Sequence, residues 1–179
     1  SLDRLPDLSG PRAGLACAGA VTGNPRLAGS MLNDEANDNF EMLYGPTWLG
    51  TMSQWAAVAA ELRDTRAASA LYGKLKPWKE LFGTAGPLPI HGVSHALGRL
   101  AVLLGDKDAA GQHFALAWHI HQRMRAPFYT AETALYWGRM HMESDPDRAR
   151  SLLTQALELA RRHGFGDVER LIKPSSRNN

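Results

Sequence analysis

The stretch at residues 106–114 reads Asp-Lys-Asp-Ala-Ala-Gly-Gln-His-Phe, with Asp first, Ala in the fifth place and a large apolar residue in the ninth. The same spacing of Asn or Asp, Ala and a large apolar residue occurs four times: Asn24/Ala28/Leu32, Asp64/Ala68/Tyr72, Asp106/Ala110/Phe114 and Asp145/Ala149/Leu153. Successive Ala residues of this pattern are 40, 42 and 39 residues apart. Periods of this size are typical of stacked helical hairpins. The sequence therefore predicts a helical repeat protein.

A second pattern, a large apolar residue followed by a small one, stands eight or nine residues before each Asn or Asp. The four pairs are Leu15-Ala16, Trp55-Ala56, Leu97-Gly98 and Trp137-Gly138. Each unit then becomes a helix that carries the pair, a short turn, and a second helix capped by the Asn or Asp. Such a cap contributes roughly 1 kcal/mol. The small residue and the Ala mark the place where the two backbones approach closely, and we expect Trp55 and Trp137 to lie in the core.

The chain is accordingly predicted to be an all-α, superhelical array of about four hairpins. Residues 1–10 are expected to be irregular, residues 11–172 to form the repeat domain, and the polar residues 173–179 to fray. Residues 83–90 combine Gly and Pro and are predicted to be a loop, and no stretch alternates as a half-buried strand would. The predicted helices span residues 11–22, 25–38, 47–62, 65–81, 91–104, 107–125, 128–143, 146–163 and 166–172. The first unit is the least regular, because Glu35 occupies one of its apolar positions.

The charge, the length of the apolar runs and the cysteine content limit the partners and the compartment that we expect for this chain. Twenty basic and 18 acidic residues leave a formal charge of +2 on 179 residues, which does not provide the basic surface of a nucleic-acid binder. No apolar run reaches the roughly 18 to 20 residues that a membrane span needs. Cys17 is the only cysteine, so a cytoplasmic, reducing compartment is expected. The first residue is Ser1, which suggests a segment of a longer protein.

Several stretches resemble a known family. The spacing of Ala110, Phe114 and Ala117 resembles the tetratricopeptide repeat (TPR), with longer connections than usual. Residues from about 48 to 172 resemble the C-terminal helical region of large actinobacterial signalling proteins, in which a nucleotide cyclase or LuxR-type DNA-binding domain is joined to a P-loop ATPase and TPR-like repeats. The stretches that carry this resemblance are Leu71-Tyr72-Gly73-Lys74-Leu75-Lys76-Pro77, Leu97-Gly98-Arg99-Leu100-Ala101 and Asp147-Arg148-Ala149-Arg150-Ser151-Leu152-Leu153.

The resemblance implies a regulatory or scaffolding segment of a transcriptional or signalling regulator. The family's catalytic and ATP-binding residues lie in other domains, and none of them maps onto this chain. A Gly-x4-Gly-Lys-Ser/Thr loop is also absent from the sequence. We therefore expect no catalysis and no cofactor here.

Two motifs suggest chemistry only weakly. His91 and His95 are four residues apart and would share a helix face, but no Cys or Glu completes a known zinc spacing, so no metal site is predicted. The stretch from Gly92 to Ala96, with Ser94 at its centre, loosely resembles a nucleophile elbow. That elbow must lie between a strand and a helix, and Pro87-Leu88-Pro89-Ile90 is a poor strand, so a simple helix start is favoured.

The remaining functional hypothesis is a groove. In TPR arrays the first helices of successive hairpins line the inner surface, and the residue after the small one tends to face it. This register selects Ala57, Arg99 and Arg139, with His95, Glu61 and Glu143 nearby. Two Arg residues on adjacent repeats would suit a carboxylate, such as that of a peptide.

The predicted function is therefore a protein-interaction or regulatory scaffold that binds a protein or peptide, or other domains of the parent chain. The alternative is a sensor that holds a small effector in the concave groove and controls an attached ATPase or cyclase. A further alternative is self-association through apolar end faces into a homo-oligomer. Neither a nucleic acid nor a membrane is an expected partner.

Overall fold

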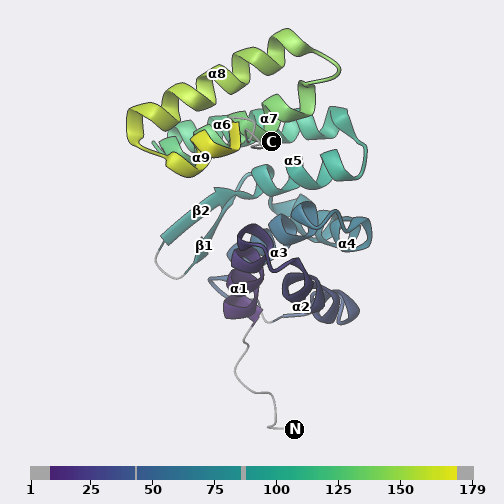
Figure 1. The fold of residues 1–179 in the computed structure, drawn as a ribbon. Helices are drawn as coiled ribbons and strands as arrows, with labels where there is room; N and C mark the ends of the chain where they lie inside the picture. The colour runs from purple at the N-terminus through teal and green to yellow at the C-terminus, as the bar shows by residue number, and fades with distance from the viewer. Residues whose placement is uncertain (1–8, 43, 86–87, 173–179) are drawn as a thin grey trace, which may run out of the picture.

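The computed structural model describes residues 9–42, 44–85 and 88–172, and these are predominantly helical (Figure 1). The predicted segments 1–10 and 173–179 lie outside this part of the chain, except for the first residues of α1. Within it there are nine α-helices, one 3₁₀ turn and one two-stranded sheet. The elements are α1 (Ser9–Thr22), α2 (Pro25–Asn37), α3 (Trp48–Glu61), α4 (Thr65–Leu75), η1 (Lys76–Trp78), β1 (Phe82–Ala85), β2 (Leu88–Gly92), α5 (Val93–Leu103), α6 (Lys107–Arg123), α7 (Pro127–His141), α8 (Pro146–His163) and α9 (Gly166–Ile172).

The helices pack as consecutive pairs, α1 with α2, α3 with α4, α5 with α6 and α7 with α8. Figure 1 shows the pairs stacked from α1 and α2 at one end to α8 at the other. The first helices also contact each other in turn, α1 with α3, α3 with α5 and α5 with α7. The predicted helices all exist, but the one predicted at 65–81 ends at Leu75. Pro77 ends it, because proline has no N–H to continue the helical ladder.

All four predicted caps are present. A side-chain oxygen of Asn24, Asp64, Asp106 and Asp145 accepts a hydrogen bond from the backbone N–H three residues later, at 3.3, 2.9, 2.9 and 3.1 Å. These bonds satisfy donors that the first turn of a helix otherwise leaves unpaired. The repeated Asn or Asp therefore sets the start of α2, α4, α6 and α8.

The predicted close approach of small residues is confirmed in the third and fourth units. A Cβ placed on Gly98 would lie 2.7 Å from the Phe114 ring, and one on Gly138 would lie 2.9 Å from Leu153. Each small residue of a first helix thus makes room for the large residue of the second helix. The first unit departs from the rule, since Leu15 is 53% exposed.

Of the two Trp residues predicted in the core, Trp55 is fully buried and its indole N–H donates to Ser9 Oγ at 3.3 Å. Trp137 is only partly buried and lies under the Arg148 guanidinium, 5.1 Å from its ring centroid. The prediction is confirmed for the first and only partly for the second.

The prediction that residues 83–90 form a loop is wrong, because most of this segment belongs to the strands β1 and β2. β1 and β2 pair as an antiparallel hairpin, with Phe82 opposite Gly92 and Thr84 opposite Pro89, and a break in register between Phe82 and Thr84. The hairpin lies against α3, where a Cβ on Gly50 would stand 2.0 Å from the Thr84 carbonyl oxygen. Backbone pairing and this glycine contact stabilise strands that have no alternating pattern.

The hairpin also corrects the argument about the resemblance to a nucleophile elbow. β2 runs directly into α5, so a strand does precede the helix. Ser94 is nevertheless fully buried within the first turn of α5. Among the described residues, no helix is both long and apolar enough to cross a membrane.

Candidate functional site

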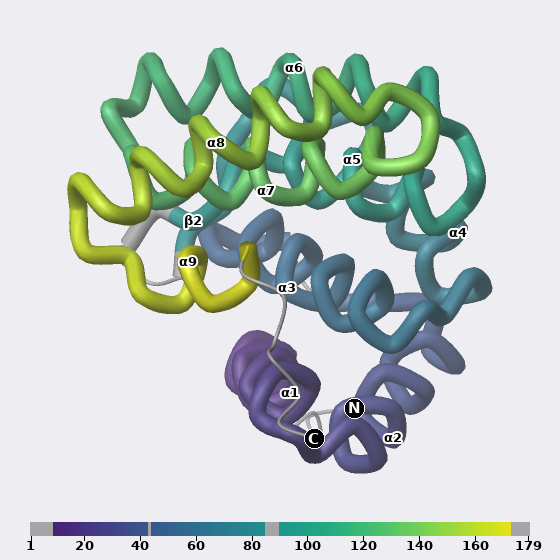
Figure 2. Tube along the Cα trace, turned by 45° about the horizontal axis from the view of Figure 1, so that its top comes forward, coloured from purple at the N-terminus to yellow at the C-terminus, as the bar shows by residue number. Residues whose placement is uncertain are grey.

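The first helices line a half-open cavity of about 790 Å³, which we call the inner cavity. Of the hairpin helices, only the first of each pair, α1, α3, α5 and α7, lines it; β2 and α9 complete the wall. Figure 2 shows α1, α3 and α9 around this region, with α8 and α6 farther out. The lining residues are Cys17, Ala20, Val21, Thr22, Ser53, Gln54, Ala57, Val58, Glu61, Ile90, His91, Arg99, Phe128, Tyr129, Glu132, Tyr136, Asp167, Arg170 and Leu171.

Arg99 is fixed within this wall. Its Nη2 lies 3.2 Å from Glu61 Oε2, and its guanidinium stacks on the Tyr136 ring at 4.2 Å from the centroid. The Arg99 side chain is 13% exposed. Stacking and pairing together hold an arginine whose charge is largely withdrawn from water.

His91 and Glu132 form a second pair on the wall. The ring N–H at His91 Nε2 donates to Glu132 Oε2, and the rings of His91 and Tyr129 lie 4.7 Å apart. On its other face His91 stacks on His95, at 4.5 Å between ring centroids and an angle of 16°. The pair therefore joins the cavity wall to the buried histidines behind it.

Behind His91 a hydrogen-bond chain runs through the core with a direction set by a backbone amide. The Gly92 N–H donates to His121 Nε2 at 2.7 Å, so the proton of neutral His121 must lie on Nδ1. From Nδ1 it donates to Thr133 Oγ1 at 3.1 Å, and Thr133 Oγ1 also lies within hydrogen-bond distance of His95 Nδ1, at 2.9 Å. His95 Nε2 is buried and has no hydrogen-bond partner among the described residues.

The two histidines of this hydrogen-bond chain, His121 and His95, are held uncharged at neutral pH. Burial first, and then the nearby His91, lower the pKa of His121 to about 4, although the Tyr129 carbonyl and Glu132 act to raise it. Burial, followed by the neighbouring His91 and Arg99, lowers the pKa of His95 well below its usual value. A proton added at His121 Nε2 would point at the Gly92 N–H. Two hydrogen-bond donors would then face each other, which disfavours protonation of His121.

The short helix α9 closes one side of the inner cavity. Arg139 Nη2 donates to the Leu171 carbonyl at 2.8 Å, and Arg161 Nε lies 3.5 Å from Glu169 Oε1. Arg139 also lies over the Tyr136 ring, on which Arg99 stacks. The two Arg residues selected by sequence therefore meet at one tyrosine.

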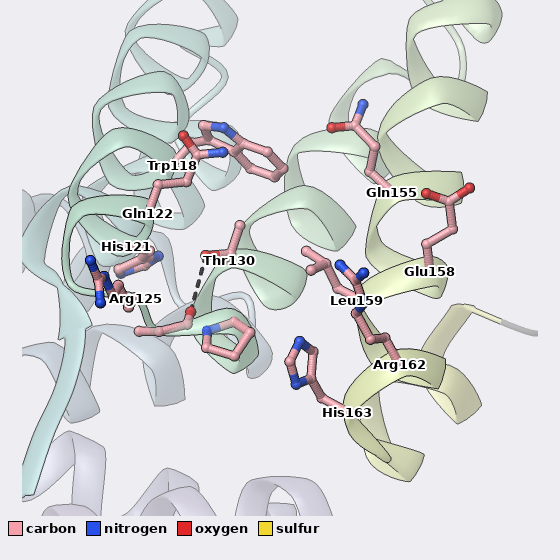
Figure 3. Close-up of a pocket in the computed structure, with 12 residues that line it drawn as sticks. Trp118, His121, Gln122, Arg125, Thr130, Gln155, Glu158, Leu159, Arg162 and His163 are labelled. Carbon is pink, nitrogen blue, oxygen red and sulfur yellow. Dashed lines mark hydrogen bonds between the residues drawn. The ribbon is translucent and has the colours of Figure 1, made fainter.

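A second hollow, the outer groove, lies between α6 and α8 above the start of α7 and measures about 740 Å³. Figure 3 shows Trp118 and Gln122 on one wall, Gln155 and Arg162 on the other, and Thr130 between them. His121 contributes to its lining. The buried histidine chain thus separates the outer groove from the inner cavity.

The structure brings together some of the predicted groove residues. Ala57, Glu61 and Arg99 line the inner cavity, and Arg139 lines a neighbouring hollow of about 260 Å³ together with Glu61 and Arg99. His95 is instead buried at 3% exposure, because β2, α6 and α7 cover the first turn of α5. Glu143 is exposed beyond the end of α7, and it lines neither hollow.

Sequence reasoning missed the α7 wall, formed by Tyr129, Glu132 and Tyr136. Their spacing of three and four residues places them on one helix face, a signal that was present in the sequence. It was not distinctive, because any amphipathic helix shows it.

Among the residues that the structure describes, no group of three or more His, Cys, Asp or Glu side chains is arranged to hold a metal ion. Comparison of the chain with protein-family models, with curated proteins and with solved structures finds no match.

Proposed function

We propose that this chain is a TPR-like regulatory module that senses a small effector in the inner cavity, within a larger signalling protein of the kind that its sequence resembles. The observation that carries the proposal is a cavity of about 790 Å³ bordered by the first helix of every hairpin. Small-molecule sites typically measure about 300–1,000 Å³, with an apolar lining and a few placed polar groups. A ligand held there would contact every unit of the array.

The test is a thermal-shift screen of metabolites against the wild-type chain and Ala57→Phe, which places a ring in the cavity. A ligand at a hundred times its Kd should stabilise the fold by about 2.7 kcal/mol and raise Tm by roughly 5–10 °C. Ala18→Phe, an exposed position on α1 outside the cavity, is the matched control and should keep the shift. The proposal fails if no compound shifts the wild type, or if the shifts persist in Ala57→Phe.

Protein–protein interaction is a second candidate function, and the outer groove favours it. Arg125 and Arg162 line the groove together with one carboxylate, Glu158, and no ion pair within 4.0 Å joins either arginine to an acidic side chain of the described residues. An acidic peptide could therefore pair with these two arginines. Arg99 in the inner cavity is different, because it already pairs with Glu61.

Peptides selected by display on the wild-type chain test this second candidate. We expect the doubly substituted Arg125→Glu/Arg162→Glu variant to bind acidic peptides at least tenfold more weakly, and Ala57→Phe to bind them unchanged. Equal binding by the double variant and the wild type would reject the groove as the docking site.

A further inference from the structure

The charged side chains that line the inner cavity are all paired within its wall. Glu61 pairs with Arg99 and Asp167 pairs with Arg170, while the Glu132 carboxylate accepts a hydrogen bond from the His91 ring. A ligand carrying a net charge would have to displace one member of a pair. The displaced partner of Arg99 or of Glu132, whose side chains are 13% and 18% exposed, would leave an uncompensated, largely desolvated charge, which is costly. Asp167 and Arg170 are exposed and would remain solvated.

Apart from the uncharged polar residues Thr22, Ser53 and Gln54, the rest of the lining is mainly apolar and of two kinds. α1 and α3 present small aliphatic side chains, including Val21 and Val58, while α7 presents the rings of Phe128 and Tyr136. Aliphatic and aromatic surfaces of this kind suit the body of a ring-containing, apolar molecule.

One polar group on the wall is unpaired and carries no charge. Ser53 lines the cavity, is 5% exposed, and its hydroxyl has no hydrogen-bond partner among the described residues. That hydroxyl oxygen is itself inaccessible to solvent, so it faces the packed interior and not the open space of the cavity.

We infer that the inner cavity takes an uncharged, largely apolar small molecule, and not a carboxylate or another ion. This inference rests on the proposed function and specifies its ligand. Under this inference Arg99 and Arg139 do not bind a ligand carboxylate; they hold the wall together through Glu61, Tyr136 and the Leu171 carbonyl.

Two fluorescent probes that share one ring system test the charge selectivity. N-phenyl-1-naphthylamine is neutral, and 8-anilino-1-naphthalenesulfonate adds a sulfonate. We expect the neutral probe to bind the wild-type chain with a Kd at least tenfold below that of the anionic probe. Ala57→Phe should weaken the neutral probe at least tenfold, and Ala18→Phe should leave its Kd unchanged.

Glu61→Gln provides the decisive variant, because it leaves Arg99 without its carboxylate. The anionic probe should then bind at least fivefold more tightly than to the wild type, and the neutral probe should be unaffected. If neither probe responds to Ala57→Phe, the cavity binds nothing and the proposed function fails as well. If the anionic probe matches or exceeds the neutral one and Ala57→Phe abolishes both, the cavity is a ligand site but the inferred ligand class is wrong.

Discussion

Lowering the pH from 7 to 5 is expected to destabilise the fold by about 2 kcal/mol through His121, because unfolded histidines titrate near pH 6.5 and burial lowers the folded pKa of His121 to about 4. The lowered pKa of buried His95 adds to this loss in the same direction. In that interval the unfolded chain binds more protons than the folded chain. The histidine contribution is therefore fully present above about pH 6.5 and is lost as the pH falls toward 4. The charged or titratable neighbours of this pair include His91, Glu132 and Arg99, together with the rings of Tyr129 and Tyr136.

Urea unfolding at pH 7 and pH 5 measures this loss, and a variant isolates its source. His121→Gln can still accept the Gly92 N–H and donate to Thr133 but cannot titrate, so it should remove about 2 kcal/mol of the pH-dependent loss. His119→Gln, at an exposed position two residues earlier on α6, should leave the loss unchanged. A pH dependence that is equal in His121→Gln and the wild type would show that the buried chain is not its origin.

The second large effect is expected from Gly50→Ala. The new Cβ would stand 2.0 Å from the Thr84 carbonyl oxygen and 2.8 Å from its carbon, both backbone atoms that no side-chain rotation can move away. Overpacking of this kind typically costs about 1–3 kcal/mol and forces backbone shifts. We expect a loss of about 3 kcal/mol, with faster amide exchange in β1 and β2.

Gly73→Ala is the matched control, because nothing lies within 4 Å of its added Cβ in the exposed part of α4. A glycine inside a helix costs roughly 0.5–1 kcal/mol relative to alanine, so this variant should be slightly more stable than the wild type. Gly50→Ala as stable as Gly73→Ala would mean that the hairpin does not rest on α3 at Gly50.

The parts of the fold that were predictable depend on local interactions. A cap joins a side chain to an amide three residues away, so Asp64 and Asp106 could be read directly from the spacing. The helical hairpins followed from the same spacing. The β-hairpin could not be read in this way, because its position depends on Gly50 meeting Gly83, 33 residues later, and not on a pattern within the strands.

The site was only partly predictable for a related reason. The repeat register correctly predicted that Ala57 and Arg99 face the inner cavity. The same register predicts that every turn of a first helix is accessible from the cavity, whatever packs against that turn. His95 lies one turn before Arg99 on the same face, and only the tertiary packing of β2 and α7 determines that it is covered. The chain from His121 through Thr133 joins residues 12 apart on neighbouring helices, so no sequence spacing identifies it.

The wall of the inner cavity runs from Cys17 in α1 to Leu171 in α9, near the two ends of the described chain. Helical arrays normally unfold by fraying, because each unit depends only on its neighbours. A molecule that fills this cavity would be released when any one unit opens, so its binding free energy would oppose the opening of all of them equally. Occupancy would thus turn a linear, end-fraying array into a single cooperative folding unit.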